Sequence, residues 1–465
     1  MNSKFVYLST FLFIFSSCST GAQVPVIEVK EELNVLENVE LDYENSFFDD
    51  FSGGVDSSYW FIGNQAWGDG NGGVLPKNVH YTDDGLLQLV GNGAYYTDND
   101  LIGVGDVKDG RYTGAALISK FKTKPGRYQI RMKALPRLGA CTAFWTYAYK
   151  FNTNTDNLNH EIDIELPGGN RSGIPSFTNI LNTNYETEKK YNSQDTKLSD
   201  IFDQDVYLND GDWHTFGFDW YTNPKKVVYF VDNKICAISD FFVPDLETRL
   251  WLGVWFPVSS SFVGTPFFES DSMKVDWVKY IPFKNQPYTP FDPEVKGVAL
   301  ENEYPSRPES LFISDMVSNG DFEYLKNNQK ENKGWDFKKY LSEKQELELV
   351  SNAGKGIGYD GSYGAFVKDG GVLQQNIDSI YQGFKYDFKF ASKIDGGKGK
   401  VTIQYLGYTE SDLIGTEVFE ITNNVWEKFE KQITVPEGTY SIKIFINSEV
   451  GNTLYIDDVS LINKG

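Results

Sequence analysis

Three carboxylates recur at every second position in the stretch HEIDIELPGG, residues 160–169, where Glu161, Asp163 and Glu165 alternate with apolar residues. On a β-strand, successive side chains point to opposite faces, so this spacing places the carboxylates together on one face. Asp and Glu are disfavoured inside strands, and three in register repel one another unless a proton is shared. The spacing alone is better explained by an outer strand with a solvated charged face. A functional role for the trio therefore needs an additional, chemical argument.

Hydrolysis of a glycosidic bond is a reaction that uses such a trio. The Cα atoms of Glu161 and Glu165 would lie roughly 13 Å apart on an extended strand. Long side chains leaning inward can bring their carboxyl groups to the separation of about 5 Å that retaining glycosidases use. One carboxylate would attack the anomeric carbon while the other protonates the departing oxygen, and Asp163 would hydrogen-bond the nucleophile and help to keep the second glutamate protonated. The three groups would titrate as one coupled unit.

Aromatic residues accompany the trio in the preceding segment TAFWTYAYKF, residues 142–151, where a solvated face would carry polar side chains. Sugar rings pack their C–H faces on aromatic planes, so a polysaccharide groove needs exposed Trp and Tyr beside polar residues. Trp251 is equally consistent with a core position. The candidate substrate-binding aromatics are Trp145, Tyr147, Trp251 and Trp255, with Trp67 in the loop NQAWGDGNGG.

The elements that must position these residues are short strands separated by turn signals, from residue 47 to residue 283. Helical periodicity is scarce, which predicts an antiparallel β-sandwich rather than an α/β barrel. Six prolines between residues 282 and 310 predict a stiff linker. We therefore expect an all-β chain, with a catalytic domain over residues 46–283, a Pro-rich linker over 284–310 and a smaller β-sandwich over 311–465.

The trio and its surroundings resemble glycoside hydrolase family 16, whose signature is Glu-x-Asp-x-Glu. The segments GAALISKFKTKPGRYQIRMK, TNYETEKK, GDWHTFGFDWY, VVYFVDN and SMKVDWVKY resemble that family's successive strands, in order. The resemblance implies a concave β-jelly-roll sandwich and a double-displacement mechanism that retains the anomeric configuration. Carried over by position, Glu161 is the nucleophile, Asp163 the assisting carboxylate and Glu165 the general acid/base.

The details of the motif bear on the substrate. The spacing lacks the extra residue of the bulged Glu-x-Asp-x-x-Glu form and is closer to the lichenase and xyloglucan-active branches. His160 precedes the first glutamate where the family often has Gly, Asp or Asn; a strand-end histidine with a local hydrogen bond is the preferred interpretation over a substrate contact. Asn184 matches a position where family members often have a polar substrate contact, and its structural alternative is an ordinary turn residue.

The C-terminal unit opens with SNGDFE, continues to GW and closes with YIDDVSL, a pattern that resembles carbohydrate-binding jelly-roll modules. In related modules the opening acidic segment and the closing Asp pair can hold a structural calcium, to which Glu323 and Asp458 would contribute here. No cofactor is required for the predicted reaction. A spacer domain that binds nothing is the alternative of nearly equal weight.

The N-terminus combines a basic start, a short apolar run and Phe-Ser-Ser-Cys, which predicts a lipoprotein-type signal peptide over residues 1–18 and lipidation of Cys18. Residues 19–45 read as an acidic tether, and we expect a cell-surface or outer-membrane lipoprotein attached by this lipid alone. Cleavage near Ala22 would instead give a secreted protein. Cys141 and Cys236 read as buried thiols rather than a disulfide.

The composition limits the classes of molecule that the protein can bind. The formal net charge of -22 repels polyanions, so nucleic acid is excluded and a neutral polymer is favoured. Three histidines without metal-ligand spacing give zinc or histidine-dependent catalysis little support, and no metal site is predicted. We predict a monomeric, endo-acting, retaining glycoside hydrolase that cleaves a β-1,3 or mixed β-1,3/1,4-glucan. The alternatives are an agar- or carrageenan-type galactan hydrolase and a glycan-binding lipoprotein without turnover.

Overall fold

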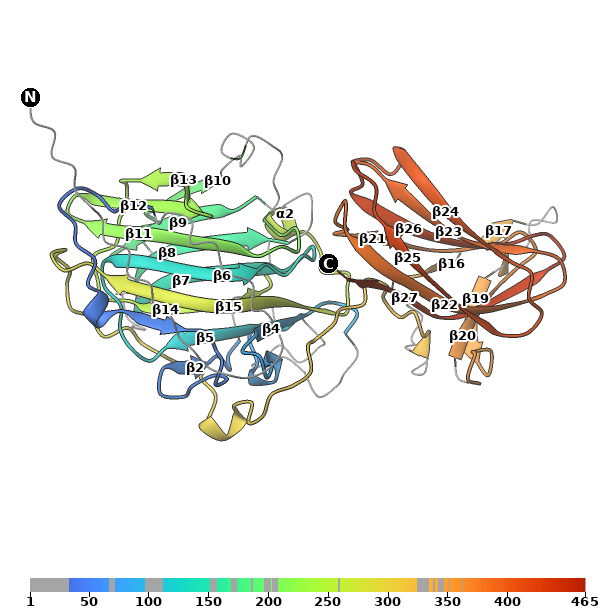
Figure 1. Cartoon of the computed structure of the whole chain (residues 1–465), viewed down its shortest axis with the longest axis horizontal. Coiled ribbons are helices and arrows are strands. Elements are labelled where there is room, and N and C mark those ends of the chain that lie inside the picture. Colours follow the sequence, from blue (N-terminus) through green and yellow to red (C-terminus); the bar gives the residue numbers. More distant parts are fainter. Residues whose placement is uncertain are drawn as a thin grey trace, which may run out of the picture.

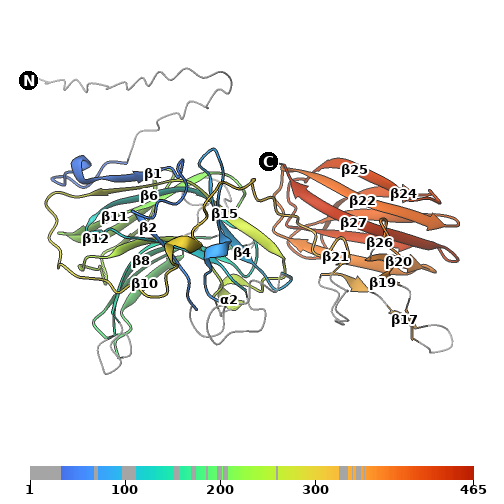
Figure 2. The ribbon, with the colours of Figure 1, turned by 90° about the horizontal axis from the view of Figure 1, so that it is seen from below.

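Strands make up almost all of the regular structure in the computed structural model of the chain (Figure 1). They form two β-domains that lie side by side along the long axis of the molecule (Figure 2). The structure describes residues 33–464 apart from 67–71, 97–111, 151–156, 169–173, 185–186, 196–201, 203–207, 258–259, 324–333, 338, 342–346, 350 and 362.

The first domain contains an eight-stranded antiparallel sheet whose path runs β13-β12-β11-β6-β15-β4-β3, with β1 paired to β15. Its strands carry apolar residues at alternate positions, as in Val227, Tyr229 and Val231, and these face the core. The strands are β1 (Phe47–Asp49), β3 (Val79–Tyr81), β4 (Leu87–Asn92), β6 (Gly126–Lys133), β11 (His214–Thr222), β12 (Lys225–Val231), β13 (Lys234–Ser239) and β15 (Ser270–Pro282).

A seven-stranded antiparallel sheet packs against the first one and has the order β10-β9-β8-β7-β14-β5-β2. The inner faces of the two sheets share one large core, which includes Trp60, Phe144 and Trp220, all fully buried. The strands of this sheet are β2 (Trp60–Ile62), β5 (Ala115–Ser119), β7 (Cys141–Lys150), β8 (Leu158–Pro167), β9 (Ser176–Asn182), β10 (Tyr191–Asp195) and β14 (Arg249–Trp255).

The second domain is a smaller sandwich with its own core, built around residues such as Phe388, Ile403 and Ile444. One sheet has the order β16-β21-β26-β23-β24, the other β19-β20-β27-β22-β25, and β17 pairs with β18. Their bounds are β16 (Asp336–Phe337), β17 (Lys339–Leu341), β18 (Leu347–Leu349), β19 (Ser351–Lys355), β20 (Tyr363–Lys368), β21 (Val372–Asp378), β22 (Lys385–Asp395), β23 (Gly399–Leu406), β24 (Leu413–Ile421), β25 (Glu427–Thr434), β26 (Ser441–Ser448) and β27 (Thr453–Asn463).

Helices are few and short among the described residues: α2 (Ser260–Val263) and the 3-10 turns η1 (Tyr43–Asn45), η2 (Pro76–Asn78) and η4 (Glu301–Glu303). None of the described helices is long and apolar enough to cross a membrane. The predicted fold class, a jelly-roll-like sandwich followed by a smaller β-sandwich, is confirmed.

The segments expected to be a tether and a linker pack on the first domain where they are described. Leu36 donates its backbone N–H to the Tyr221 hydroxyl (3.2 Å), and Val35, Val39 and Leu41 cover the same outer cluster of the eight-stranded sheet. Residues 284–310 run along the domain surface, where the Tyr304 hydroxyl accepts the Ile62 N–H and donates to the Trp60 carbonyl. Several of their apolar side chains, among them Val35, Val39, Val295 and Val298, are partly buried against the domain.

Candidate active site

Strand β8 carries Glu161, Asp163 and Glu165 between β7 and β9, in the interior of the seven-stranded sheet. Ile162, Ile164 and Leu166 are fully buried in the core between the sheets, so the three carboxylates share the opposite face of the strand. A strand with neighbours on both sides has its backbone fixed by two hydrogen-bond ladders. The three side chains are therefore presented from a rigid part of the fold.

Each glutamate has a different donor beside it. The Asn159 side-chain amide donates to Glu161 Oε2 (3.0 Å), while the Cys141 thiol lies 3.9 Å from Glu165 Oε1 and donates to it. Asp163 is 7% exposed and hydrogen-bonds the Glu161 carboxyl. Glu161 and Glu165 remain partly exposed, so both can meet a ligand.

The environment raises the pKa of all three carboxyl groups. Burial is the main cause for Glu161, opposed by the hydrogen bond from Asn159. Burial also raises the pKa of Asp163, which is further raised by the charges of both glutamates. The pKa of Glu165 is raised by burial and then by the charge of Glu161, and the Cys141 hydrogen bond lowers it. Three neighbouring negative charges in a buried site would repel one another strongly. We therefore expect the three carboxyl groups to share protons and to titrate together.

Aromatic side chains lie on the same face, on the neighbouring strand β7 and on β14, the strand beyond it. Trp145 pairs with Asp163 and Tyr147 with Glu161 across the β7–β8 ladder. Trp145 stacks on Trp251 at 5.5 Å between ring centroids, and both are 5% exposed, so they form a floor rather than an open platform. Tyr147 and Trp255 are more exposed, and Trp255 pairs with Cys141 at the Glu165 end of the site.

Hydroxyl groups line the other side of the trio, on β9 and β10. Thr178 pairs with Asp163 and Ser176 with Glu165 across the β8–β9 ladder. The Thr178 hydroxyl donates to Ser193 Oγ (2.9 Å), and Ser176 and Ser193 share a hydrogen bond of 3.1 Å. The carboxylates thus lie between an aromatic row and a hydroxyl row, which is the combination that a sugar ring with its hydroxyl groups requires.

Sequence analysis missed Asn159, Cys141 and the hydroxyl row. Alternation along β8 already places Asn159 on the carboxylate face, two residues before Glu161, so its position was available from the sequence. Cys141 and Thr178 approach the trio only through strand register, which the sequence does not fix.

The other expected site residues lie apart from the trio or outside the described residues. Asn184 lies beyond the end of β9, where its backbone carbonyl accepts the Glu188 N–H (2.8 Å). Phe144, read from the sequence as part of the aromatic surface, is fully buried on the opposite face of β7 because it alternates with Trp145. Trp67 and Cys18 fall outside the described residues.

His160, His214 and Trp220 have structural surroundings. His160 lies on the core side of β8, 5% exposed, with Nδ1 3.6 Å from Asp245, and burial lowers its pKa to about 4. His214 bridges Asp210 and Asp232; burial opposes its protonation, but the two carboxylates raise its pKa to about 9. Trp220 is fully buried in the core.

A structural calcium was expected in the second domain at Glu323 and Asp458. The Asp458 carboxylate is half exposed and pairs with Lys428 Nζ (3.5 Å), while Glu323 Oε1 accepts the Tyr363 N–H (3.0 Å). In the described part of the chain, no group of three or more His, Cys, Asp and Glu side chains is placed to hold a metal ion. These donors fit a calcium site poorly, and calcium binding stays a prediction.

Two family models match the chain. Residues 77–241 match glycosyl hydrolases family 16, and residues 314–453 match a carbohydrate binding domain. The first match contains the whole of β8 with its carboxylates, and the second contains most strands of the smaller sandwich. No curated protein matches the chain.

Several solved structures resemble the first domain. A β-1,3-1,4-glucanase (lichenase) from a mouse hindgut metagenome is 22% identical, with 50% of this chain and 98% of that chain covered and a TM-score of 0.39. The laminarinase catalytic domain of Thermotoga maritima is 18% identical, with 54% and 100% covered and a TM-score of 0.40. Porphyranase B of Zobellia galactanivorans is 20% identical, with 55% and 97% covered and a TM-score of 0.41.

Proposed function

From a family 16 glycosyl hydrolase domain followed by a carbohydrate-binding domain, we propose an endo-acting, retaining hydrolase that cleaves a β-1,3 or mixed β-1,3/1,4-glucan. The observation that carries the proposal is the trio on β8: Glu161, Asp163 and Glu165 share one face, with aromatic rings on one side and hydroxyl groups on the other. A merely solvated strand would not bury Asp163 to 7% exposure.

In the proposed first step, a Glu161 carboxylate oxygen attacks the anomeric carbon as the bond to the glycosidic oxygen breaks. Glu165 gives its proton to that departing oxygen, which leaves as a hydroxyl group, and a glycosyl ester on Glu161 remains. In the second step Glu165 takes a proton from water, which attacks the anomeric carbon and frees Glu161. Two inversions retain the configuration.

The neighbours of each glutamate fit these roles. The Asn159 amide stabilises the charged form of Glu161, which a nucleophile needs. Burial and the Glu161 charge favour the protonated form of Glu165, which a general acid needs. Asp163 lies between the two glutamates on β8 and hydrogen-bonds Glu161.

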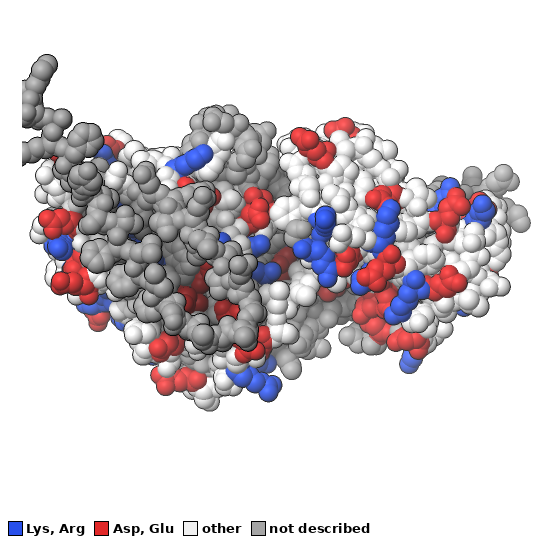
Figure 3. All heavy atoms as spheres, viewed as in Figure 1, with Lys and Arg blue, Asp and Glu red and all other residues white. Residues whose placement is uncertain are grey.

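Charge supports a neutral substrate. The net charge of -22 opposes the approach of a sulfated polymer. The described side chains that flank the trio, Trp145, Tyr147, Thr178 and Ser176, are all uncharged. On the part of the surface drawn in Figure 3 that is not grey, Lys and Arg lie interspersed with Asp and Glu and form no broad basic area.

A panel of polysaccharides with sizing of the products tests the proposal. We expect release of oligosaccharides of several lengths from a β-1,3 or mixed-linkage glucan, and little cleavage of agar or carrageenan. Proton NMR of the first product should show the β anomer. An α-first product would contradict double displacement, and cleavage restricted to agar or carrageenan would contradict the glucan.

The N-terminal sequence supports a second proposal, attachment to the cell surface through a lipid on Cys18. Replacing Cys18 with Ser should move the protein from the membrane fraction to the soluble fraction, and metabolic labelling with a fatty acid should fail in that variant. Equal labelling of both forms would exclude Cys18 as the attachment point.

A further inference from the structure

An open cleft of about 450 Å³ lies at the junction of the two domains, away from the carboxylate trio. On the side of the catalytic domain, the cleft is lined by residues around Arg137 and by residues that follow α2. On the side of the second domain, it is lined by β21. Figure 1 shows α2 and β21 facing each other across this junction. The volume falls in the range of about 300–1,000 Å³ that is usual for ligand sites.

The catalytic-domain wall carries a pair of stacked aromatic rings. Tyr95 and Phe267 lie 5.8 Å apart between ring centroids at an interplanar angle of 17°. Phe267 is 65% exposed, so a large part of its surface faces the solvent at the edge of the cleft. An aromatic plane held in place by a second ring is a suitable support for the C–H face of a sugar.

The second-domain wall carries polar side chains in a row. Gln374, Asn376 and Asp378, at alternate positions of β21, line the cleft, as do the buried Gln375 and Ile377 between them. The Gln374 amide is oriented by donating to Asp336 Oδ2 (3.1 Å) from the neighbouring strand. Asn376 and Asp378 are exposed. Amide and carboxylate groups spaced along a strand can donate to and accept from successive sugar hydroxyl groups.

The charges around the cleft select a neutral ligand. Arg137 is the cation at its base, and its guanidinium is already paired with Asp271 at 2.7 Å. Asp336 and Asp378 add negative charge at the rim. Among the described residues that line the cleft, the one cation is thus already paired, so an anionic chain would be repelled by the carboxylates, whereas a neutral polyhydroxylated chain would not.

We propose that this junction cleft is a second glycan site that binds a neutral β-glucan chain, with its aromatic surface supplied by the catalytic domain and its polar groups by β21. The proposal rests on the proposed glucanase function. It implies that glucan binding by the second domain depends on the catalytic domain, because Tyr95 and Phe267 belong to the latter.

The test uses the full chain with Glu161→Gln, so that bound oligosaccharides are not cleaved. Native mass spectrometry counts β-glucan oligosaccharides bound at saturation to this parent chain, to Glu161→Gln/Phe267→Ala and to Glu161→Gln/Asn376→Ala. Both replaced side chains are exposed, so folding should be preserved. Glu161→Gln/Phe241→Ala is the matched control, since Phe241 is 64% exposed and does not line the cleft.

We expect the Phe267 and Asn376 variants to bind one oligosaccharide fewer than the parent, or to bind it about five- to tenfold more weakly, while the Phe241 control matches the parent. Equal counts and affinities in all four proteins, together with glucan hydrolysis by the wild type, would overturn the junction site alone. If the wild type hydrolyses no glucan but the parent shows the expected loss on Phe267 replacement, only the proposed reaction fails. Binding of no oligosaccharide by the parent would overturn the junction site.

Discussion

Glu161 and Glu165 are the same amino acid on the same strand face, yet different groups touch them. An amide donates to Glu161 and a thiol to Glu165, and Asp163 hydrogen-bonds Glu161. Burial raises the pKa of the Cys141 thiol well above its usual value, with a further contribution from Glu165, so the sulfur keeps the proton that it donates. Hydrogen bonds lower the pKa of both carboxyl groups, whereas the Glu161 charge raises only that of Glu165, and the proposed division of roles uses this difference.

Replacing either glutamate with Gln should lower kcat by at least about a hundredfold. Gln keeps the volume of the side chain and removes its charge. The change in stability of the Gln variants therefore measures the effect of the charge alone. In the folded protein the pKa of both carboxyl groups is raised, so folding favours their protonated forms. Wild-type stability therefore falls as the pH rises from the unfolded value of about 4.3 through the folded value.

The Gln variants should consequently melt at or above the wild-type temperature at pH 8 and lose this advantage by pH 4. Thermal melts followed by circular dichroism across that range make the measurement. A large drop of the melting temperature in both variants at pH 8 would mean that the strand needs these charges for its structure and not for a reaction.

Asn159→Ala should move the acid limb of the kcat/KM profile to higher pH. The amide donates to Glu161 and lowers its pKa, so its removal leaves the nucleophile protonated at a pH where the wild type is charged. Asn192→Ala is the control, because Asn192 donates to Ser239 away from the trio (2.8 Å). In the proposed mechanism Asn159 is a positioning residue, and an unshifted acid limb would show that it does not act on Glu161.

At the scale of elements, the alternation on β8 was enough to predict which residues face the core and which face the ligand. The same alternation places Phe144 in the core and Trp145 beside Asp163, because consecutive residues of β7 point to opposite faces. What alternation leaves open is register. Which residue of β7 or β9 lies opposite Asp163 depends on tertiary pairing, so Cys141 and Thr178 could not be placed from the sequence.

The proline-rich segment shows a second limit of sequence analysis. Its composition predicts a stiff connection, but Val295 and Val298 pack beside Trp251 and Ala299 joins the main core. Isolated apolar residues in a polar segment have no period that reveals a partner. The cluster on which the two valines pack takes residues from β2, β5, β7 and β14, which are distant in sequence.

Tyr304→Phe should lower the free energy of unfolding by about 1–2 kcal/mol, since the phenol oxygen both accepts the Ile62 N–H and donates to the Trp60 carbonyl. Chemical denaturation gives the value. Tyr43→Phe provides the comparison, because Tyr43 is 59% exposed, and it should change stability little. If both variants match the wild type, the segment adds nothing through this hydroxyl group.

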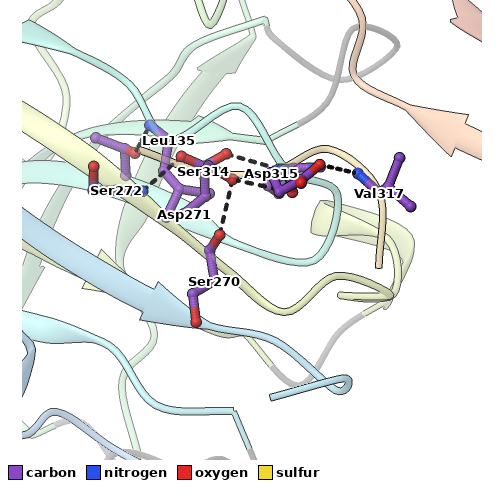
Figure 4. Close-up of polar contacts among 9 residues, drawn as sticks. Leu135, Ser270, Asp271, Ser272, Ser314, Asp315 and Val317 are labelled. Carbon is purple, nitrogen blue, oxygen red and sulfur yellow. Dashed lines mark hydrogen bonds and ion pairs between the residues drawn. The ribbon is translucent and has the colours of Figure 1, made fainter. Parts of the chain in front are cut away.

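At the scale of the molecule, polar contacts join the domains through residues that follow the proline-rich segment. Ser314 Oγ donates to the Ser270 carbonyl (3.0 Å), and Asp315 Oδ1 accepts the Val317 N–H (2.9 Å), as Figure 4 shows. Asp315 Oδ1 also accepts the Leu461 N–H from β27 (2.9 Å). A chain that passes between domains is therefore tied to both of them, which limits how freely the second domain can move.

Arg137 contacts both the first domain and the chain that leads into the second. Its side chain is 5% exposed; Nε donates to Asp271 Oδ2 (2.7 Å), and Nη2 donates to Ser314 Oγ (2.7 Å) and the Asp315 carbonyl (3.1 Å). One guanidinium thus neutralises a buried carboxylate of the first domain and binds the chain that enters the second. Removal of a partner from a buried pair leaves an uncompensated charge, at a cost of about 3–5 kcal/mol.

Arg137→Met should therefore lower the free energy of unfolding by about that amount and separate the unfolding of the two domains into resolved calorimetric transitions. Arg131→Met is the matched control: Arg131 pairs with Asp276, both are about a third exposed, and exposed pairs contribute about 0–1 kcal/mol. Because the single variant leaves the buried Asp271 carboxylate without its partner, Arg137→Met/Asp271→Asn should recover much of the lost stability without rejoining the transitions. If Arg137→Met and Arg131→Met had the same melting profile, other contacts would hold the domains together.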